Sequence, residues 1–231
     1  MFTDIQRMEF ESLHRTNTTF YIVHALGKDY FNDSFNTTNY IFFRYSDLDS
    51  NQITALGGKV FKDLPALRTI NLDRNQISTI KEGVFKDLPS LSFLYLTNNQ
   101  ITTMREVVLK DLPALFFLTL DNNQITTIQE GVFKDIPSLR VLTMNNNQMT
   151  TLPEGVFENL SRLLFIELNN NQITTIQDGV FKDLPALLRL YVYNSTTISC
   201  SKAYYFYIYN KRTLICIYNT ADCCRDINMS L

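Results

Sequence analysis

The fold is decided by the stretch Leu67-x-x-Ile70-x-Leu72-x-x-Asn75-x-Ile77-x-x-Ile80-x-x-x-x-Phe85, which the chain repeats at a constant spacing of 24 residues. The asparagine recurs at Asn51, Asn75, Asn99, Asn123, Asn147 and Asn171. The aromatic position recurs at Phe61, Phe85, Phe133, Phe157 and Phe181, and Leu109 takes its place in one copy. A fixed period of this length is typical of proteins in which each repeat packs only on its neighbours.

One copy of the repeat predicts one turn of a solenoid. Ile70 and Leu72 are two residues apart, so in a strand their side chains point to the same face. Asn75 ends the strand, and its amide can satisfy backbone groups at the bend, so stacked asparagines are expected to form a ladder. One turn buries about seven apolar side chains at roughly 1.5–3 kcal/mol each. Ordering its residues costs roughly 1.5 kcal/mol each, so a turn must stack to be stable.

The predicted fold is of the α/β class, a horseshoe-shaped leucine-rich solenoid with a parallel sheet on its concave face. The Phe-Lys-Asp-Leu-Pro segments are expected on the convex face as short helical or 3₁₀ turns, because proline cannot continue a helix. The prolines concerned are Pro65, Pro89, Pro113, Pro137 and Pro185.

The repeats divide the chain into three parts. Residues 1–42 lack the pattern and are interpreted as an irregular N-terminal cap, since an open solenoid end exposes core and strand edge. Residues 43–194 hold about seven turns. Residues 195–231 form a predicted C-terminal cap, with one or two strands expected within 201–209. This cap contains Cys200, Cys216, Cys223 and Cys224, which could form disulfides in an oxidising compartment or, as an alternative, hold zinc.

Composition argues against several classes of function. The net charge of −2 gives no basic footprint for nucleic acid. No apolar run is long enough to cross a membrane, and no signal peptide is visible at the start. The two histidines, His14 and His24, fall in the predicted N-terminal cap. No pattern of residues indicates catalysis, a metal centre or a cofactor, so a non-enzyme is predicted.

A partner is expected on the concave face, where the copies differ from one another. The outer arc repeats Val-Phe-Lys-Asp at 60–63, 84–87, 132–135 and 180–183. The concave positions vary at every turn, and Phe93, Phe117, Val141 and Phe165 would form an exposed apolar stripe, a frequent mark of a partner site. Packing between neighbouring strands is the alternative explanation. The predicted partner-binding residues are Tyr45, Phe93, Tyr95, Phe117, Thr119, Val141, Phe165, Glu167, Arg189 and Tyr191.

An acidic group shares the same face. It consists of Asp47, Asp49, Asp73 and Asp121. These side chains could attract a basic partner or Ca²⁺, or they could simply be a solvated edge.

The segments Leu152-Pro-Glu-Gly-Val-Phe157 and Leu168-Asn-Asn-Asn171-Gln-Ile173 resemble leucine-rich repeats of the 24-residue class. They are similar to repeats in variable lymphocyte receptors and in Toll-like receptor ectodomains. The resemblance implies an extracellular recognition module, with an immune or adhesion role, that binds a protein or glycan on its concave face. An intracellular scaffold or enzyme regulator in the cytoplasm, or a fragment of a larger receptor, is the alternative. The sequence contains glycosylation sequons at Asn17, Asn32, Asn36, Asn159, Asn194 and Asn228, which permit glycosylation. The sequence does not predict an oligomeric state.

Overall fold

The structure is a computed structural model that describes residues 44–57, 60–61, 63–174, 176 and 179–192, together with the strand Leu214–Cys216. The predicted N-terminal cap lies outside the described residues. So do Cys200, Cys223, Cys224 and the one or two strands expected within 201–209. Cys216 belongs to the last described strand, of which the backbone alone is described.

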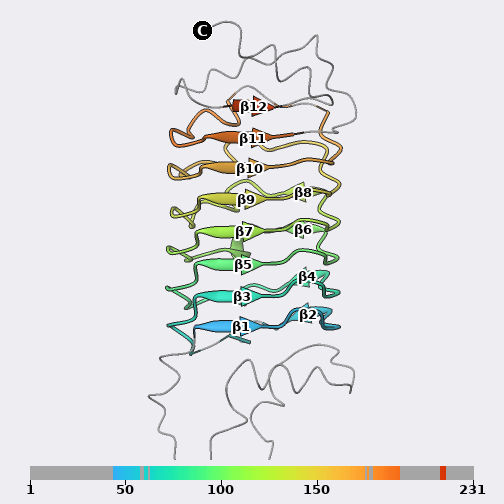
Figure 1. The fold of residues 1–231 in the computed structure, drawn as a ribbon, viewed down its shortest axis with the longest axis vertical. Helices are drawn as coiled ribbons and strands as arrows, with labels where there is room; N and C mark the ends of the chain where they lie inside the picture. The colour runs from blue at the N-terminus through green and yellow to red at the C-terminus, as the bar shows by residue number, and fades with distance from the viewer. Residues whose placement is uncertain are drawn as a thin grey trace, which may run out of the picture.

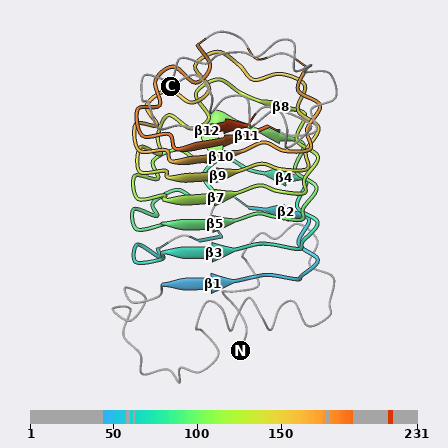
Figure 2. The ribbon, with the colours of Figure 1, turned by 45° about the horizontal axis from the view of Figure 1, so that its top comes forward.

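Eight short strands form one parallel sheet in the order β1-β3-β5-β7-β9-β10-β11-β12, with one strand from each turn (Figure 1). The strands are β1 (Tyr45–Asp47), β3 (Thr69–Asn71), β5 (Phe93–Tyr95), β7 (Phe117–Thr119), β9 (Val141–Thr143), β10 (Phe165–Glu167), β11 (Arg189–Tyr191) and β12 (Leu214–Cys216). Figure 2 shows them stacked one above another, each followed by a loop that returns to the start of the next. The prediction of a parallel-sheet solenoid is therefore confirmed.

Two further pairs of short strands follow strands of the main sheet along the chain. Strand β2 (Ala55–Leu56) pairs with β4 (Thr79–Ile80), and β6 (Thr103–Met104) pairs with β8 (Thr127–Ile128), both in parallel. Figure 1 shows these pairs beside the main sheet, where the chain turns toward its outer side.

The register of the sheet follows the sequence period. Tyr45 pairs with Thr69, Thr69 with Phe93, and so on to Phe165 and Arg189. Equivalent residues of successive turns therefore lie side by side, and every position of the repeat becomes a row along the solenoid. The last step differs, because Arg189 pairs with Leu214, one residue beyond the repeat spacing.

The core lies inside the turns. Ile70, Leu72, Ile77 and Leu88 are fully buried, and equivalent residues of the other turns are buried in the same way. The ring of Phe85 stacks on Phe61 with centroids 6.0 Å apart, and Phe157 stacks on Phe133 at 6.1 Å and on Phe181 at 5.4 Å. Stacked rings of this kind stabilise these three interfaces between turns beyond the area that they bury, whereas Leu109 interrupts the row between Phe85 and Phe133.

The asparagines join each turn to the one before it. Asn75 Oδ1 accepts a hydrogen bond from the backbone N–H of Ile53 at 3.0 Å, and Nδ2 donates to the carbonyl of Leu48 at 2.8 Å. Nδ2 also donates within its own turn, to Leu72 O at 3.1 Å. The same set recurs at Asn99, Asn123, Asn147 and Asn171. Asn51, in the first described turn, donates to the carbonyls of Leu48 and Asp49 of that turn.

The outer segments are hydrogen-bonded turns, and helix is nearly absent from the described residues. The expectation of helical or 3₁₀ segments on the outer side holds once in that part of the chain, at the 3₁₀ helix η3 (Glu106–Val108). Glycine explains the difference. Gly83, Gly131, Gly155 and Gly179 have φ between +70° and +88°, a region that other residues rarely adopt. Val107 takes the glycine position in η3, and the chain there forms a 3₁₀ turn instead.

Candidate functional site

The exposed side of the main sheet, here called the sheet face, is built from the first and third residues of each strand. The middle residue of each three-residue strand of the main sheet from β1 to β11 is buried, because alternate side chains of a strand point to opposite sides. The first residue of each strand is exposed or half-buried. The predicted partner-binding residues occupy these first and third positions, so the fold brings them to one surface.

Four aromatic side chains gather at the centre of the sheet face and form the aromatic cluster Phe93, Tyr95, Phe116 and Phe117. The ring centroids of Phe93 and Phe117 are 6.5 Å apart, as expected for paired residues of β5 and β7. Tyr95 lies 5.4 Å from Phe117, and Phe116 lies 5.9 Å from Phe93. Phe93 and Phe116 are 36 % and 37 % exposed. Two large apolar rings in mutual contact are thus left open to solvent.

Phe116 was absent from the sequence-based set of partner-binding residues. It precedes β7 by one residue, where strict alternation would place its side chain on the core side with Leu118. The signal in the sequence was the triplet Leu115-Phe116-Phe117, in which the repeat accounts only for the leucine. In the structure Phe116 widens the cluster toward the start of the strands, and the guanidinium of Arg140 lies 5.3 Å from its ring centroid.

The remaining predicted residues lie around this cluster. Tyr45 on β1 is 51 % exposed. On the other side, the guanidinium of Arg189 lies 5.9 Å from the ring centroid of Phe165 and donates to the Tyr191 hydroxyl at 3.4 Å. Val141 and Glu167 are half-buried on neighbouring strands. These residues border the aromatic cluster without adding a ring to it.

Thr119 is buried, although it was predicted to face a partner. It is 6 % exposed, and its hydroxyl is 2.7 Å from the hydroxyl of Thr97. Tyr95 is its partner in the sheet register, so a small side chain lies beside a large ring. Thr119 therefore contributes a hydrogen bond between turns and little surface.

The acidic residues at the ends of the strands are used to hold successive turns together. Asp73 Oδ1 accepts the backbone N–H of Thr97, and Asp121 Oδ1 accepts that of Asn145, both at 2.6 Å. Burial raises the pKa of Asp73 and of Asp121 above the ordinary value of 3.8, and these hydrogen bonds oppose the rise. Asp49 forms an ion pair with Arg74.

The comparisons with known proteins agree with this geometry. The family described as "Leucine rich repeat" matches residues 47–101, 83–125, 94–149, 113–173 and 137–196, which together span more than half of the chain. The chain belongs to the leucine-rich repeat family. Comparison with curated proteins found no match.

Among solved structures, the leucine-rich repeats of this chain are similar to those of TLR13 in its complex with ssRNA13. The two share 26 % sequence identity with a TM-score of 0.51 over 64 % of this chain. This chain covers 25 % of the length of the TLR13 chain. The protein is therefore a leucine-rich repeat protein similar to part of a Toll-like receptor.

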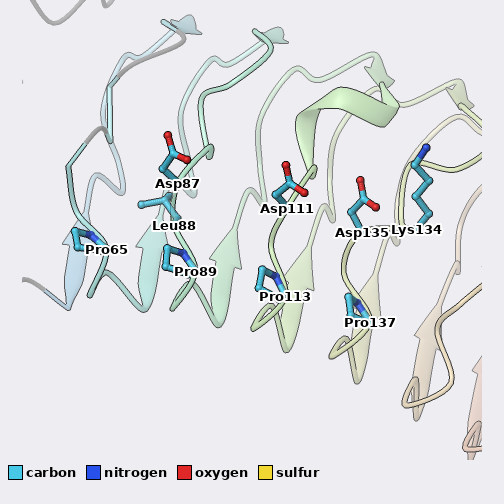
Figure 3. A pocket seen from close by; sticks show the side chains of 9 residues that line it. All are labelled: Pro65, Asp87, Leu88, Pro89, Asp111, Pro113, Lys134, Asp135 and Pro137. Carbon is cyan, nitrogen blue, oxygen red and sulfur yellow. The ribbon is translucent and has the colours of Figure 1, made fainter.

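A groove lies on the outer side of the repeats, away from the sheet face (Figure 3). It encloses about 630 Å³ and is lined by Pro65, Asp87, Leu88, Pro89, Asp111, Pro113, Lys134, Asp135 and Pro137. Figure 3 shows the prolines and the aspartates in two rows, each residue taking the same place in its own turn. The lining belongs to the segment that the repeats share, so the groove is a property of the repeat and carries no variation between turns.

Two negative findings apply to the described residues. Within them, no group of three or more His, Cys, Asp or Glu side chains is arranged to hold a metal ion. The same part of the chain contains no helix long and apolar enough to cross a membrane.

Proposed function

We propose that the protein is a non-catalytic recognition module that binds a protein partner on the sheet face, with the aromatic cluster as its centre. The observation that carries the proposal is the exposure of Phe93 and Phe116 in a group of four contacting rings. Aromatic side chains and arginine dominate the binding energy of protein interfaces, especially near the middle of the buried area. Arg140 at the side of the cluster fits the same description.

The cluster also stabilises the sheet, and this role alone would be a sufficient reason for its presence. Aromatic neighbours on adjacent strands contribute roughly 0.2–1 kcal/mol per pair. Packing does not require that the outer surfaces of Phe93 and Phe116 stay open to solvent. If the rings bind a partner, replacing them lowers the affinity for that partner even when the fold remains stable. If they only pack, replacing them lowers the stability of the sheet and leaves the affinity unchanged.

Glycan and RNA are the alternative ligands. Exposed rings can stack on a sugar, and they can stack on bases in the way that single-stranded nucleic acid is held. The matched TLR13 structure contains an RNA. The carboxylates of Asp73, Asp121 and Glu167 would repel phosphates where the strands end, and the net charge of −2 gives no overall basic surface, which favours a protein.

The proposal includes an extracellular site of action. Similarity to part of a Toll-like receptor supports it, and so does the sequon at Asn159, whose side chain is exposed on an outer turn. The intact mass of the endogenous protein, reduced and non-reduced, tests this point. Added glycan mass and a disulfide support secretion, whereas the bare mass of 26.8 kDa with four free thiols contradicts it.

The central experiment compares two triple variants. Protein partners are selected from a displayed library of folded domains with the unmodified protein as bait, and their affinities are then measured for the variants. Phe93→Ala, Tyr95→Ala and Phe117→Ala together should weaken binding by about 100-fold or more, since each ring is an anchor of ~2 kcal/mol. Lys86→Ala, Lys110→Ala and Lys182→Ala together should change it less than about threefold, because exposed side chains outside an interface contribute little.

Thermal unfolding of both variants checks that the fold survives. Equal affinities for the aromatic and the lysine variant would contradict the proposed site.

A further inference from the structure

The sheet face carries opposite charges along its two edges. Phe93 and Phe117 of the aromatic cluster lie between the edges, Phe116 lies along the basic edge and Tyr95 along the acidic edge. Arg44, Arg68 and Arg140 each precede a strand by one residue, and all three are exposed. Within the described part of the chain, none of these guanidinium groups has an ion-pair partner. They therefore form a basic row at the edge where the strands begin.

The acidic row follows the opposite edge, where the strands end. It contains Asp47, Asp73, Asp121 and Glu167, which are exposed or half-buried. Figure 1 shows the strands all running in the same direction, so their starting ends share one edge and their finishing ends the other. The parallel topology thus gathers charges from different turns into two rows of opposite sign.

The separation of the rows matches the width of an α-helix. In extended conformation the chain advances about 10 Å over the three residues from Arg44 to Asp47, and about 17 Å over the five residues from Arg68 to Asp73. A helix with its side chains is ~10–12 Å across, so a helix on the aromatic cluster would have one charged row beside each flank. Seven strands at ~4.8 Å spacing give a platform roughly 29 Å long, enough for a helix of about 20 residues.

The spacing along the platform also fits a helix better than an extended chain. An apolar stripe at alternating three- and four-residue steps advances ~5.3 Å per step along a helix. This is close to the ~4.8 Å between neighbouring strands, so successive apolar side chains can meet successive turns of the solenoid. An extended peptide places same-side residues ~6.6 Å apart and loses this match after one or two turns.

We propose that the partner presents an amphipathic α-helix that lies along the solenoid axis, across the strands, with its apolar stripe on the aromatic cluster. Its acidic flank faces the row of Arg44, Arg68 and Arg140, and its basic flank faces the acidic row. This inference rests on the proposed function and specifies the chemistry of the partner at the same site. The two charged rows would also determine which way the helix runs along the solenoid axis. Reversing the helix would place its acidic flank on the acidic row and its basic flank on the basic row.

The test is a selection from a displayed library of 21-residue helices. The library fixes an apolar stripe and randomises both flanks among Glu, Lys, Gln and Ser, and a second library contains extended, proline-rich peptides of the same length. Helices with Glu on one flank and Lys on the other should be enriched by about tenfold or more over helices with like charges on both, through charge complementarity. Flanks that stay random, or stronger enrichment of the extended peptides, would overturn the proposal.

A charge-reversed bait supplies the control. Arg68→Glu with Arg140→Glu makes both edges acidic, so selection should move to helices with Lys on both flanks. Retained preference for mixed flanks would show that the rows do not contact the helix and would likewise overturn the proposal.

The outcome separates this inference from the proposed function. If helices fail while folded domains still depend on Phe93, Tyr95 and Phe117, the helical partner is wrong and the binding face stands. If the aromatic triple variant binds selected helices and selected domains as well as the unmodified protein does, both proposals fail.

Discussion

Replacing Asn123 with alanine should destabilise the solenoid far more than the same replacement at Asn51. Asn123 Oδ1 accepts the backbone N–H of Ile101 at 3.0 Å, and Nδ2 donates to Leu96 O at 2.9 Å and Leu120 O at 3.0 Å. Without the side chain, the buried N–H of Ile101 loses its acceptor, at a cost of ~1–3 kcal/mol. Both carbonyls keep a donor from a neighbouring ladder asparagine, so their loss adds about 1 kcal/mol. The expected decrease in the free energy of unfolding is roughly 2–4 kcal/mol.

Asn51 provides the matched control. It is half-buried and, among the described residues, donates only within its own turn, to Leu48 O at 2.9 Å and Asp49 O at 3.0 Å. The carbonyl of Leu48 keeps the hydrogen bond from Asn75. Asn51→Ala should therefore cost less than about 1 kcal/mol. Urea unfolding followed by circular dichroism gives both values, with an unchanged slope as the check that the same unit unfolds. Equal losses in the two variants would refute the account of the ladder as a connection between turns.

Three further predictions concern single positions. Ser46 is fully buried, and its hydroxyl has no hydrogen-bond partner among the residues that the structure describes. Ser46→Ala should therefore raise the free energy of unfolding by ~1–3 kcal/mol in the same assay, and a loss of stability would contradict this. Gly131 has φ +76°, and a methyl group at its Cα would meet no atom closer than 3.5 Å. Gly131→Ala should therefore lower the free energy of unfolding by ~1–2 kcal/mol through backbone strain alone. An unchanged urea midpoint would refute this prediction. The pKa of Asp121 is raised in the folded state, so this state holds the proton more tightly than the unfolded state does, and stability should fall as pH rises through the raised pKa. Asp121→Asn should flatten that part of a profile of unfolding free energy measured between pH 3 and pH 7. An unaltered profile would contradict the assignment.

The fold could be predicted from the sequence because one observation, the constant period, determines most of it. Once Ile70 and Leu72 are placed inside one turn, the period puts the equivalent residues of every other turn inside as well. The register of the sheet follows with no further information. The sequence also contained the signal for η3, because Val107 stands where four other copies have glycine. Predicting a 3₁₀ turn from that difference requires the positive φ of Gly83, which the spacing of the repeat does not reveal.

Strand β12 could not be predicted in the same way. Its offset from β11 exceeds the repeat spacing by one residue, so a search at constant period misses it. No asparagine of the ladder follows it at the expected place. The remaining signal, Ile215 and Ile217 two residues apart, is too short to distinguish a strand from other structure.

The candidate site was predicted in part. Alternation in the strands places Phe93, Tyr95 and Phe117 on one surface, and their contacts follow from the register. Phe116 lies before the strand, where strict alternation would place its side chain on the core side. The burial of Thr119 depends on the size of the side chains beside it, which position in the repeat does not reveal. Sequence therefore identified the surface, while packing between turns decided which residues remain available on it.

The uniform connection between turns has a genetic consequence. Each ladder asparagine from Asn75 to Asn171 bonds to the turn before it, at a spacing of 24 residues that the sheet register repeats. Gain or loss of a block of 24 codons would leave every remaining asparagine opposite an equivalent partner. Such an event would lengthen or shorten the sheet face by one strand without disturbing the core. A gene built in this way can change the shape of its recognition surface by unequal recombination, in steps that the fold accommodates without further mutation.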